Sequence, residues 1–415
     1  MLHVIILLLI AAAFVLIVVE DIVHINKAKT TLFFGALVWL LTFIFPEPGQ
    51  DPAVIQAAIN ENLLEIATLW LFLMAAMTFV AYLNQKGLIE SIIYRILPEQ
   101  VSERKLMLMT ALFCFFFSSI ADNITATLIS ITLVLSLKMP LQKTLKFAVL
   151  VVFSVNSGGV ALITGDVTTL MIFMADKVEI SHLLILSIPS FIAVMILTFI
   201  LSRGLSGEVM IQRKNHVIER LDYIIAGIFL STIISTIFLN LFFSIPPVLT
   251  FLFGLSIMFL TAQLYHRNEE GSKIIEYMRT IEFDTLLFFL GVLLLVGMMK
   301  EIGVLDAIPA IYEYLPSVAA NFIMGLLSAG VDNVPLTAAL LKSGVEMSTA
   351  EWLTLTYAVG VGGSLLVIGS AAGIVAMSKV GGMTFGSYLR YSGYLLFAFA
   401  IGFSGSFAVG HLIHG

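Results

Sequence analysis

Two Asp-Asn pairs lie in the middle of long apolar stretches of this sequence, at Asp122-Asn123 and Asp332-Asn333. In each stretch a serine stands four residues before the aspartate and a threonine five residues after it, giving the matched residues Ser118, Thr127, Ser328 and Thr337. A carboxylate at the centre of a bilayer costs about 2.5–3.5 kcal/mol on insertion scales, so it is rare there and usually serves a function. Two such carboxylates at matched positions predict a symmetric cation site.

A third carboxylate, Asp166, belongs to a glycine-rich run at 158–166, which has a counterpart at 362–370. Seven residues separate the first glycine from the last in both runs. Glycine lets a helix unwind, which frees backbone carbonyls and helix ends to face an ion. Because Ser370 takes the place of Asp166 in the second run, Asp166 has no acidic counterpart, and we expect it to contact a bound substrate. The polar residues that could line the same break are Asn156, Thr168 and Thr169.

Each of these residues also has a purely structural interpretation. Asn123 and Asn333 are suited to cap the helix that follows, as well as to offer a carbonyl oxygen to an ion. Ser118 and Ser328 lie one turn before the aspartates, where a hydroxyl either contacts the carboxylate or bonds its own helix backbone. Glycines also let helices pack closely, but here they cluster at matched points of two spans. No Lys or Arg lies within these segments, so we expect the carboxylates to have no basic partner.

The composition is that of an integral membrane protein. The chain is 60% hydrophobic and 12% charged, with a mean hydropathy of +1.06. Apolar runs of about 20 residues are long enough to cross a bilayer as helices. No long polar segment could form a soluble domain, and the single cysteine, Cys114, excludes an intramolecular disulfide. We predict about ten spanning helices in one all-α polytopic unit covering 1–415, at 2–19, 30–46, 64–83, 147–174, 182–202, 221–241, 246–264, 283–300, 348–378 and 388–411.

The distribution of basic residues predicts the orientation. Lys and Arg favour cytoplasmic loops. If both termini lie outside, 18 of the 21 basic residues fall on the cytoplasmic side, and the exceptions are Lys177, Lys300 and Lys342. The expected outer loop at 47–62 carries acidic residues and no basic ones.

The two Asp-Asn segments then begin and end on opposite faces of the membrane. Charge counting does not distinguish a re-entrant hairpin from two full spans. Each arm of 106–137 has about 16 residues, or about 24 Å of helix against a hydrocarbon core of about 30 Å, which favours hairpins. Inverted repeats with broken helices are typical of secondary transporters with a midplane site. We predict repeats at 64–174 and 283–378, with hairpins at 106–137 and 315–342 and broken helices at 147–174 and 348–378.

At these motifs the chain resembles the NhaD-type sodium/proton antiporters of the ion transporter superfamily. The resemblance rests on Ser-x-x-x-Asp-Asn at 118–123 and 328–333, on 156–159 with 165–169, and on 362–364 with 369–373. It implies a homodimer in the lipid bilayer of the prokaryotic inner membrane that exchanges Na⁺ or Li⁺ for H⁺ without a cofactor. The polar site residues that it implies are Ser118, Asp122, Asn123, Asn156, Asp166, Thr168, Thr169, Ser328, Asp332, Asn333, Ser364 and Ser370.

Two other functions remain as alternatives. The superfamily includes carriers of dicarboxylates and arsenite, but an aspartate at both hairpin tips would repel an anion. An intramembrane hydrolase using two aspartates would place them on adjacent spanning helices and would leave the glycine-rich breaks unexplained. The sequence contains no Walker motif and no nucleophile elbow, and we expect neither enzymatic activity nor nucleic-acid binding.

Overall fold

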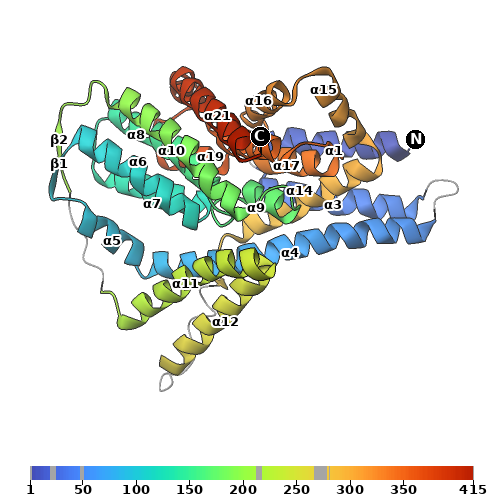
Figure 1. Ribbon diagram of the computed structural model, residues 1–415, viewed down its shortest axis with the longest axis horizontal. Coiled ribbons are helices and arrows are strands. Elements are labelled where there is room, and N and C mark those ends of the chain that lie inside the picture. Colours follow the sequence, from blue (N-terminus) through green and yellow to red (C-terminus); the bar gives the residue numbers. More distant parts are fainter. Residues whose placement is uncertain are drawn as a thin grey trace.

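The computed structural model describes residues 2–18, 25–46, 51–211, 217–265, 278–279 and 281–414, and it is built almost wholly of helices (Figure 1). A small antiparallel sheet pairs β1 (Gln100–Ser102) with β2 (Glu208–Met210), with Val101 opposite Val209. The longer helices are α1 (Leu2–Val18), α3 (Lys27–Ile44), α4 (Pro52–Gln85), α6 (Glu103–Ile120), α7 (Asn123–Ser136), α8 (Leu141–Gly159), α10 (Ile180–Ser202), α11 (Arg220–Phe243), α12 (Pro247–Tyr265), α14 (Phe283–Glu301), α16 (Ser317–Ser328), α17 (Asn333–Lys342), α18 (Thr349–Gly362) and α21 (Ser392–His414). The shorter ones are α5 (Leu88–Ile96), α9 (Val167–Met174), η1 (Val304–Ala307), α15 (Ile308–Tyr314), η2 (Gly363–Leu365), α19 (Ala371–Lys379) and α20 (Phe385–Leu389).

Seven helices among the described residues are long and apolar enough to cross a membrane: α3, α4, α10, α11, α12, α14 and α21. Each of them corresponds to a span predicted from the sequence. The other three predicted spans give shorter helices. The span at 2–19 becomes the 17-residue α1. Those at 147–174 and 348–378 divide into α8 with α9 and α18 with α19, because the chain leaves the helix between the two members of each pair.

The helix α4 is much longer than predicted. It begins at Pro52 and has 34 residues, or about 51 Å of helix, whereas the predicted span began at residue 64. The expected outer loop at 47–62 is therefore helical from Pro52 onwards, and residues 47–50 lie outside the described part. Asp51 caps the helix by accepting a hydrogen bond from the amide of Ala53, and proline is favourable in the first turn. The hydropathy pattern did not predict the first part of α4, because polar and apolar residues alternate irregularly between residues 52 and 63.

A helix–turn–helix pair and a broken helix occur twice in the chain. The first set is α6–α7 with α8–α9, and the second is α16–α17 with α18–α19. The first helix of each pair packs on the first half of the broken helix that follows it. The second helices cross over, because α7 packs on α19 and α17 packs on α9. The hairpins therefore contact the broken helices of both sets.

Glycines allow the close approach within each set. A Cβ at Gly165 would lie 2.4 Å from the carbonyl oxygen of Ser118, and one at Gly369 would lie 2.5 Å from that of Ala329. Real Cβ atoms do not approach backbone oxygens so closely, because packed interiors tolerate no such overlap. The glycines of the two breaks are therefore required for contact with the neighbouring hairpin, whatever else they do.

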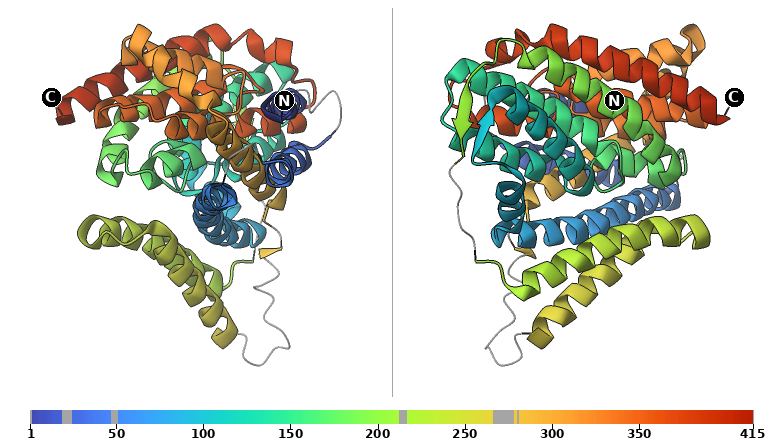
Figure 2. Two further views of the ribbon diagram at one scale, coloured as in Figure 1. Left: turned by 90° about the vertical axis from the view of Figure 1, so that its right-hand side faces the viewer. Right: turned by 60° about the vertical axis from the view of Figure 1, so that its left-hand side comes forward.

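Three helices outside these sets, α3, α4 and α14, pack on one another. The helices α3 and α14 run parallel and in contact, since the indole N–H of Trp39 donates to the carbonyl of Leu294 at 3.0 Å. The long α4 packs on α14 on one side and on α11 and α12 on the other, and the α11–α12 pair extends away from the body of the protein (Figure 2).

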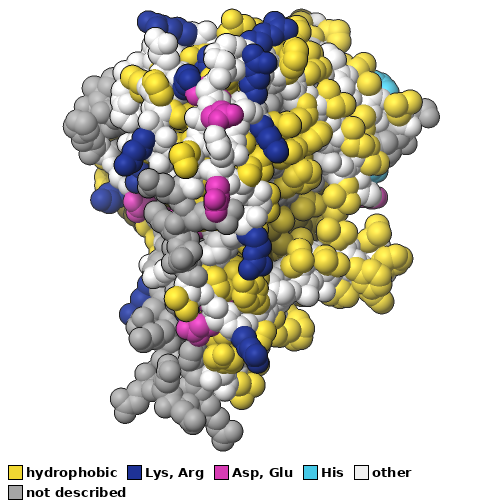
Figure 3. Space-filling view, turned by 90° about the vertical axis from the view of Figure 1, so that its left-hand side faces the viewer, with side chains coloured by type: hydrophobic (Ala, Val, Ile, Leu, Met, Phe, Trp, Pro, Cys, Tyr) yellow, Lys and Arg dark blue, Asp and Glu magenta, His cyan; other side chains and the backbone are white. Residues whose placement is uncertain are grey.

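Charged residues mark the two ends of the long helices. Lys300 and Lys342 pair with Glu61 and Glu65 in the first part of α4, at 3.7 Å and 2.5 Å. At the other end, near β1 and β2, Lys and Arg side chains gather on the surface (Figure 3). Two of the three basic residues predicted to lie outside, Lys300 and Lys342, are thus at the end of the molecule opposite the basic one.

Candidate functional site

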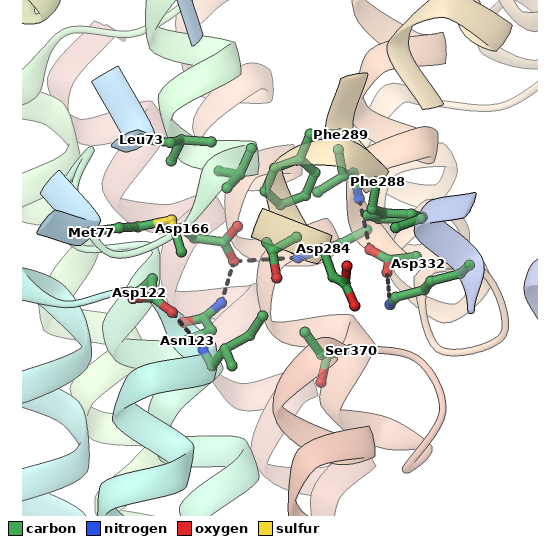
Figure 4. A pocket seen from close by; sticks show the side chains of 18 of the residues that line it. Leu73, Met77, Asp122, Asn123, Asp166, Asp284, Phe288, Phe289, Asp332 and Ser370 are labelled. Carbon is green, nitrogen blue, oxygen red and sulfur yellow. Dashed lines mark hydrogen bonds and ion pairs between the residues drawn. The ribbon is translucent and has the colours of Figure 1, made fainter. Parts of the chain in front are cut away.

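Four helices, α7, α9, α17 and α19, begin at one cavity of about 130 Å³ (Figure 4). This volume leaves room for a small cation with several water molecules. The residue before each helix caps it, and all four capping residues line the cavity: Asp122, Asp166, Asp332 and Ser370. The partial positive charge of each helix N-terminus stabilises an ionised carboxylate beside it. The three carboxylate caps therefore place negative charge beside the backbone donors of three helix N-termini at one cavity.

Asp166 lies at the centre of the hydrogen-bond network. Its Oδ1 accepts from the amide and the hydroxyl of Thr168, at 2.9 Å and 3.0 Å. Its Oδ2 accepts from the side-chain amides of Asn123 at 3.1 Å and Asn333 at 3.3 Å. The two asparagines that follow the matched aspartates thus both donate to Asp166, the carboxylate without an acidic counterpart in the other half. Only 5% of the Asp166 surface is exposed, and this residue lines the cavity.

The sequence offered two interpretations of the asparagines, and the structure differs from the first, in which they cap the helices that follow them. The aspartate that precedes each of them is the cap, so neither Asn123 nor Asn333 caps a helix. Asp122 accepts from the amides of Ile124 and Thr125 and from the Thr125 hydroxyl at 2.7 Å. Each asparagine is consequently the first residue of its helix, with its side chain directed at Asp166.

The remaining predicted residues stand behind the cavity. Asn156 donates to the Ser370 hydroxyl at 3.0 Å, which joins the two broken helices, and Ser118 donates to Asn123 at 2.9 Å. Ser328 and Ser364 are buried but bond the backbone carbonyls of Val359 and Val361.

Thr169 is buried as well, and its hydroxyl has no hydrogen-bond partner among the described residues. The side chains of Ser328, Ser364 and Thr169 do not line the cavity. The bond to the serine's own helix backbone, offered by the sequence for Ser118 and Ser328, is formed by neither of them, because Ser118 donates to the Asn123 side chain and Ser328 to a carbonyl of another helix.

Asp332 has a basic partner, contrary to our expectation. The ammonium of Lys27, at the start of α3, lies 3.3 Å from its Oδ2 and 4.6 Å from the ring centre of Phe288. Both Lys27 and Asp332 line the cavity. Because 305 positions separate the two residues in the chain, inspection of the Asp-Asn segments alone did not reveal the pair.

A fourth carboxylate, Asp284, also lines the cavity and was not among the predicted site residues. It is exposed, in the first turn of α14, and accepts a hydrogen bond from the Asn26 side chain at 2.7 Å. Apolar walls are supplied by α4 and α14 through Leu73, Met77, Phe288 and Phe289. Its position at the start of a predicted span could have indicated Asp284 as a site residue. Charged residues are common at the ends of spans, however, so this position alone does not distinguish a site residue.

No three His, Cys, Asp or Glu side chains in the described part of the chain converge to form a cage for a metal ion. The residues that line the cavity offer carboxylate, amide and hydroxyl oxygens.

Known proteins match this chain along nearly its whole length. A sodium/proton antiporter NhaD of Vibrio cholerae is 32% identical over 95% of this chain and 89% of its own length. The NhaD of Alkalimonas amylolytica is 30% identical over 96% of this chain and 88% of its own. The chain belongs to the NhaD sodium/proton antiporter family. The resemblance seen at the motifs is thereby confirmed. A sodium/proton antiporter 1 of Arabidopsis thaliana is 26% identical over 96% of this chain.

A broader family model, described as citrate transporter, matches residues 14–362. It includes every residue that lines the cavity except Ser370 and Ala371. The NhaD family and the citrate-transporter description thus point to substrates of opposite charge, and the charge of the site distinguishes between them.

Proposed function

We propose that this protein is a secondary antiporter that exchanges Na⁺ or Li⁺ for H⁺ across the membrane, with Asp166 as the central carboxylate of a shared cation and proton site. The observation that carries this proposal is the convergence of Asn123 and Asn333 on Asp166 beside a cavity that also contains Asp122 and Asp332. Membership of the NhaD family supports the same exchange.

The charge of the cavity favours a cation over citrate, arsenite or another anion. Helix N-termini are ready sites for anions, but here Asp122, Asp166 and Asp332 already accept the backbone hydrogen bonds of three of them. An entering anion would find these donors occupied and would face four carboxylates with one ammonium, that of Lys27. A small cation would instead be attracted.

Hydrolysis by an aspartate pair is not favoured by this geometry. Asp122 and Asp332 hold helix N-termini rather than each other, and no hydrogen bond joins two carboxylates among the described residues. A shared proton between two aspartates is what such an enzyme requires.

Cation-dependent proton movement in proteoliposomes tests the function. With a pH-sensitive dye inside the vesicles, adding NaCl or LiCl outside should drive protons out, whereas potassium citrate and arsenite should not. In the same direction of exchange, an imposed proton gradient that is acidic inside should drive ²²Na⁺ uptake. Proton movement that follows citrate and ignores Na⁺ would refute the proposal and support the anion carrier.

Replacing Glu282, which precedes α14, should change Na⁺ affinity only at alkaline pH. Burial, aided by the negative charges of Asp122 and Asp284, raises the pKa of Glu282 to about 7. Gln mimics the protonated form, so Glu282→Gln and the parent should have the same half-saturating Na⁺ concentration at about pH 6. At about pH 8.5 the variant lacks a negative charge near Asp122 and should require severalfold more Na⁺. An equal difference at both pH values would contradict this role.

We propose further that the two sets of helices are inverted repeats, each with a re-entrant hairpin. The matched approaches of Gly165 to Ser118 and Gly369 to Ala329 support the repeat. An ion pair supports the inversion of one repeat relative to the other. Lys300 at the end of α14 pairs with Glu61 in the first part of α4, so these two helices run in opposite directions. Non-helical backbone at the tips would be buried against the broken helices, as the membrane interior requires.

The orientation follows from the positive-inside rule, with both termini outside a prokaryotic inner membrane. With this orientation, the exposed Asn26–Asp284 pair supports a cavity mouth that faces the cytoplasm. Cysteines at exposed Lys138 and exposed Glu346, in a Cys114→Ser background, test it. An impermeant thiol reagent outside intact cells should label position 346 and spare position 138, and the reverse pattern would invert the topology. Lys342 is unsuitable because it is largely buried in its ion pair.

The family resemblance also supports a homodimer. Light scattering of the detergent-purified protein should then give a protein mass of about twice 45.4 kDa. A mass of a single chain would contradict it.

A further inference from the structure

Lys27 brings a positive charge of the protein itself into a cavity otherwise rich in carboxylates. Its ammonium lies 3.3 Å from Asp332 Oδ2, and its side chain is 20% exposed while that of Asp332 is 11% exposed. It also lies 4.6 Å from the ring centre of Phe288, an arrangement that stabilises an ammonium. The pair thus occupies a partly desolvated position, where an ion pair is stronger than at the surface.

The position of the pair connects it with the cation site. Asn333 follows Asp332 in the chain and donates to Asp166, so the Lys27 contact and the central carboxylate are joined through one helix N-terminus. In addition, Asp332 has only a single, long backbone bond, from Val334 at 3.3 Å, whereas Asp122 has three hydrogen bonds from its own helix. Asp332 therefore accepts fewer hydrogen bonds from its own helix than Asp122 does, and the Lys27 ammonium supplies a further partner.

We propose that Lys27 is a tethered competitor of the transported cation: its ammonium holds Asp332 while the site is free of Na⁺, and Na⁺ binding displaces it. This inference rests on the proposed cation site. An ammonium and a sodium ion carry the same charge, so the carboxylate can be neutralised by either, and the presence of one weakens binding of the other. Lys27 would thereby set the Na⁺ affinity of the antiporter and keep the empty site from retaining an uncompensated charge.

The alternative is a structural ion pair that joins α3 to α17. The two roles predict opposite effects of removing the charge. Loss of a competitor strengthens Na⁺ binding, whereas loss of a structural pair weakens the fold and leaves Na⁺ binding unchanged or weaker.

Na⁺-dependent thermal stabilisation of the purified protein distinguishes these roles without requiring transport. Lys27→Gln should lower the half-saturating Na⁺ concentration about tenfold. Lys29→Gln removes the same charge from an exposed position two residues later and should shift it less than twofold. Lys27→Arg keeps the charge and should shift the half-saturating Na⁺ concentration much less than Lys27→Gln does. In an Asp332→Asn background the effect of Lys27→Gln should disappear. An unchanged or raised half-saturating concentration in folded Lys27→Gln would overturn the proposal.

A second measurement uses the unaltered protein, so it does not depend on a variant folding. Reductive methylation of lysine amines, quantified by mass spectrometry, should modify Lys27 severalfold faster in Na⁺ than in choline, because displacement releases the amine from Asp332. Lys29 should react equally in both. Slower or unchanged modification of Lys27, in a protein that Na⁺ still stabilises, would refute the competitor and leave the antiporter intact. If Na⁺ stabilises the parent protein at no concentration, the proposed cation site itself fails.

Discussion

Asp166→Asn should abolish cation/proton exchange while leaving the protein folded. The substitution keeps the shape and the cap, because the Asn oxygen can still accept from the Thr168 amide. It removes the charge on which Asn123 and Asn333 converge. At an effective dielectric constant of about 20, a charge pair about 4 Å apart is worth about 4 kcal/mol, so cation binding should weaken about a thousandfold. Dye-based exchange in proteoliposomes should therefore fall to the level of empty vesicles.

The matched control is Asp176→Asn, which makes the same substitution at the exposed far end of α9. Asp176 has a φ of +54°, a conformation that Asn tolerates well, so this variant should fold and exchange like the parent. Full exchange by a monodisperse Asp166→Asn protein would show that the central carboxylate of the network is not the ion site.

The half-saturating Na⁺ concentration should fall steeply as pH rises. The ligand carboxylates must lose a proton before they bind Na⁺, so protonation and Na⁺ binding exclude each other. For simple competition, each pH unit below the pKa of the site changes the half-saturating concentration by up to about tenfold, equivalent to about 1.4 kcal/mol. Above that pKa the curve should level off. Exchange rates measured from about pH 6 to pH 9 over a range of NaCl concentrations give this curve, and a constant value throughout would contradict a shared site.

The sequence allowed a good prediction of which residues meet, because burial of polar groups in apolar stretches has few explanations. Asp122, Asn123, Asp166, Asp332, Asn333 and Ser370 all line one cavity or bond directly to a residue that does. The helix breaks near Asp166 and Ser370 also lie where the glycine runs predicted them.

The details of capping could not be predicted, because Asp and Asn are almost equally good caps. In both Asp-Asn pairs the aspartate is the cap, which leaves the asparagine free to reach Asp166. In the first pair, α6 ends at Ile120, and the backbone bond from Ala121 to the Phe117 carbonyl closes it directly before Asp122.

Long-range contacts were beyond local reasoning for a different reason. Lys27 reaches Asp332 only because α3 packs along α14, which brings its first turn to the cavity. Likewise α7 and α17 cross to the broken helices of the opposite half. Apolar periodicity says little about which helices are neighbours in a protein whose helices are apolar on most faces.

Proton release on Na⁺ binding tests most directly whether one site serves both ions. The purified protein, in detergent with minimal buffer and a pH-sensitive dye, would be mixed with NaCl at several pH values, with choline chloride as the blank and Asp166→Asn as the control. We expect Na⁺ to release protons from the parent near the pKa of the site, with little release at more alkaline pH, and none from Asp166→Asn at any pH. Na⁺ that binds the parent, as shown by thermal stabilisation, without releasing protons at any pH from about 6 to 9 would contradict a shared cation and proton site.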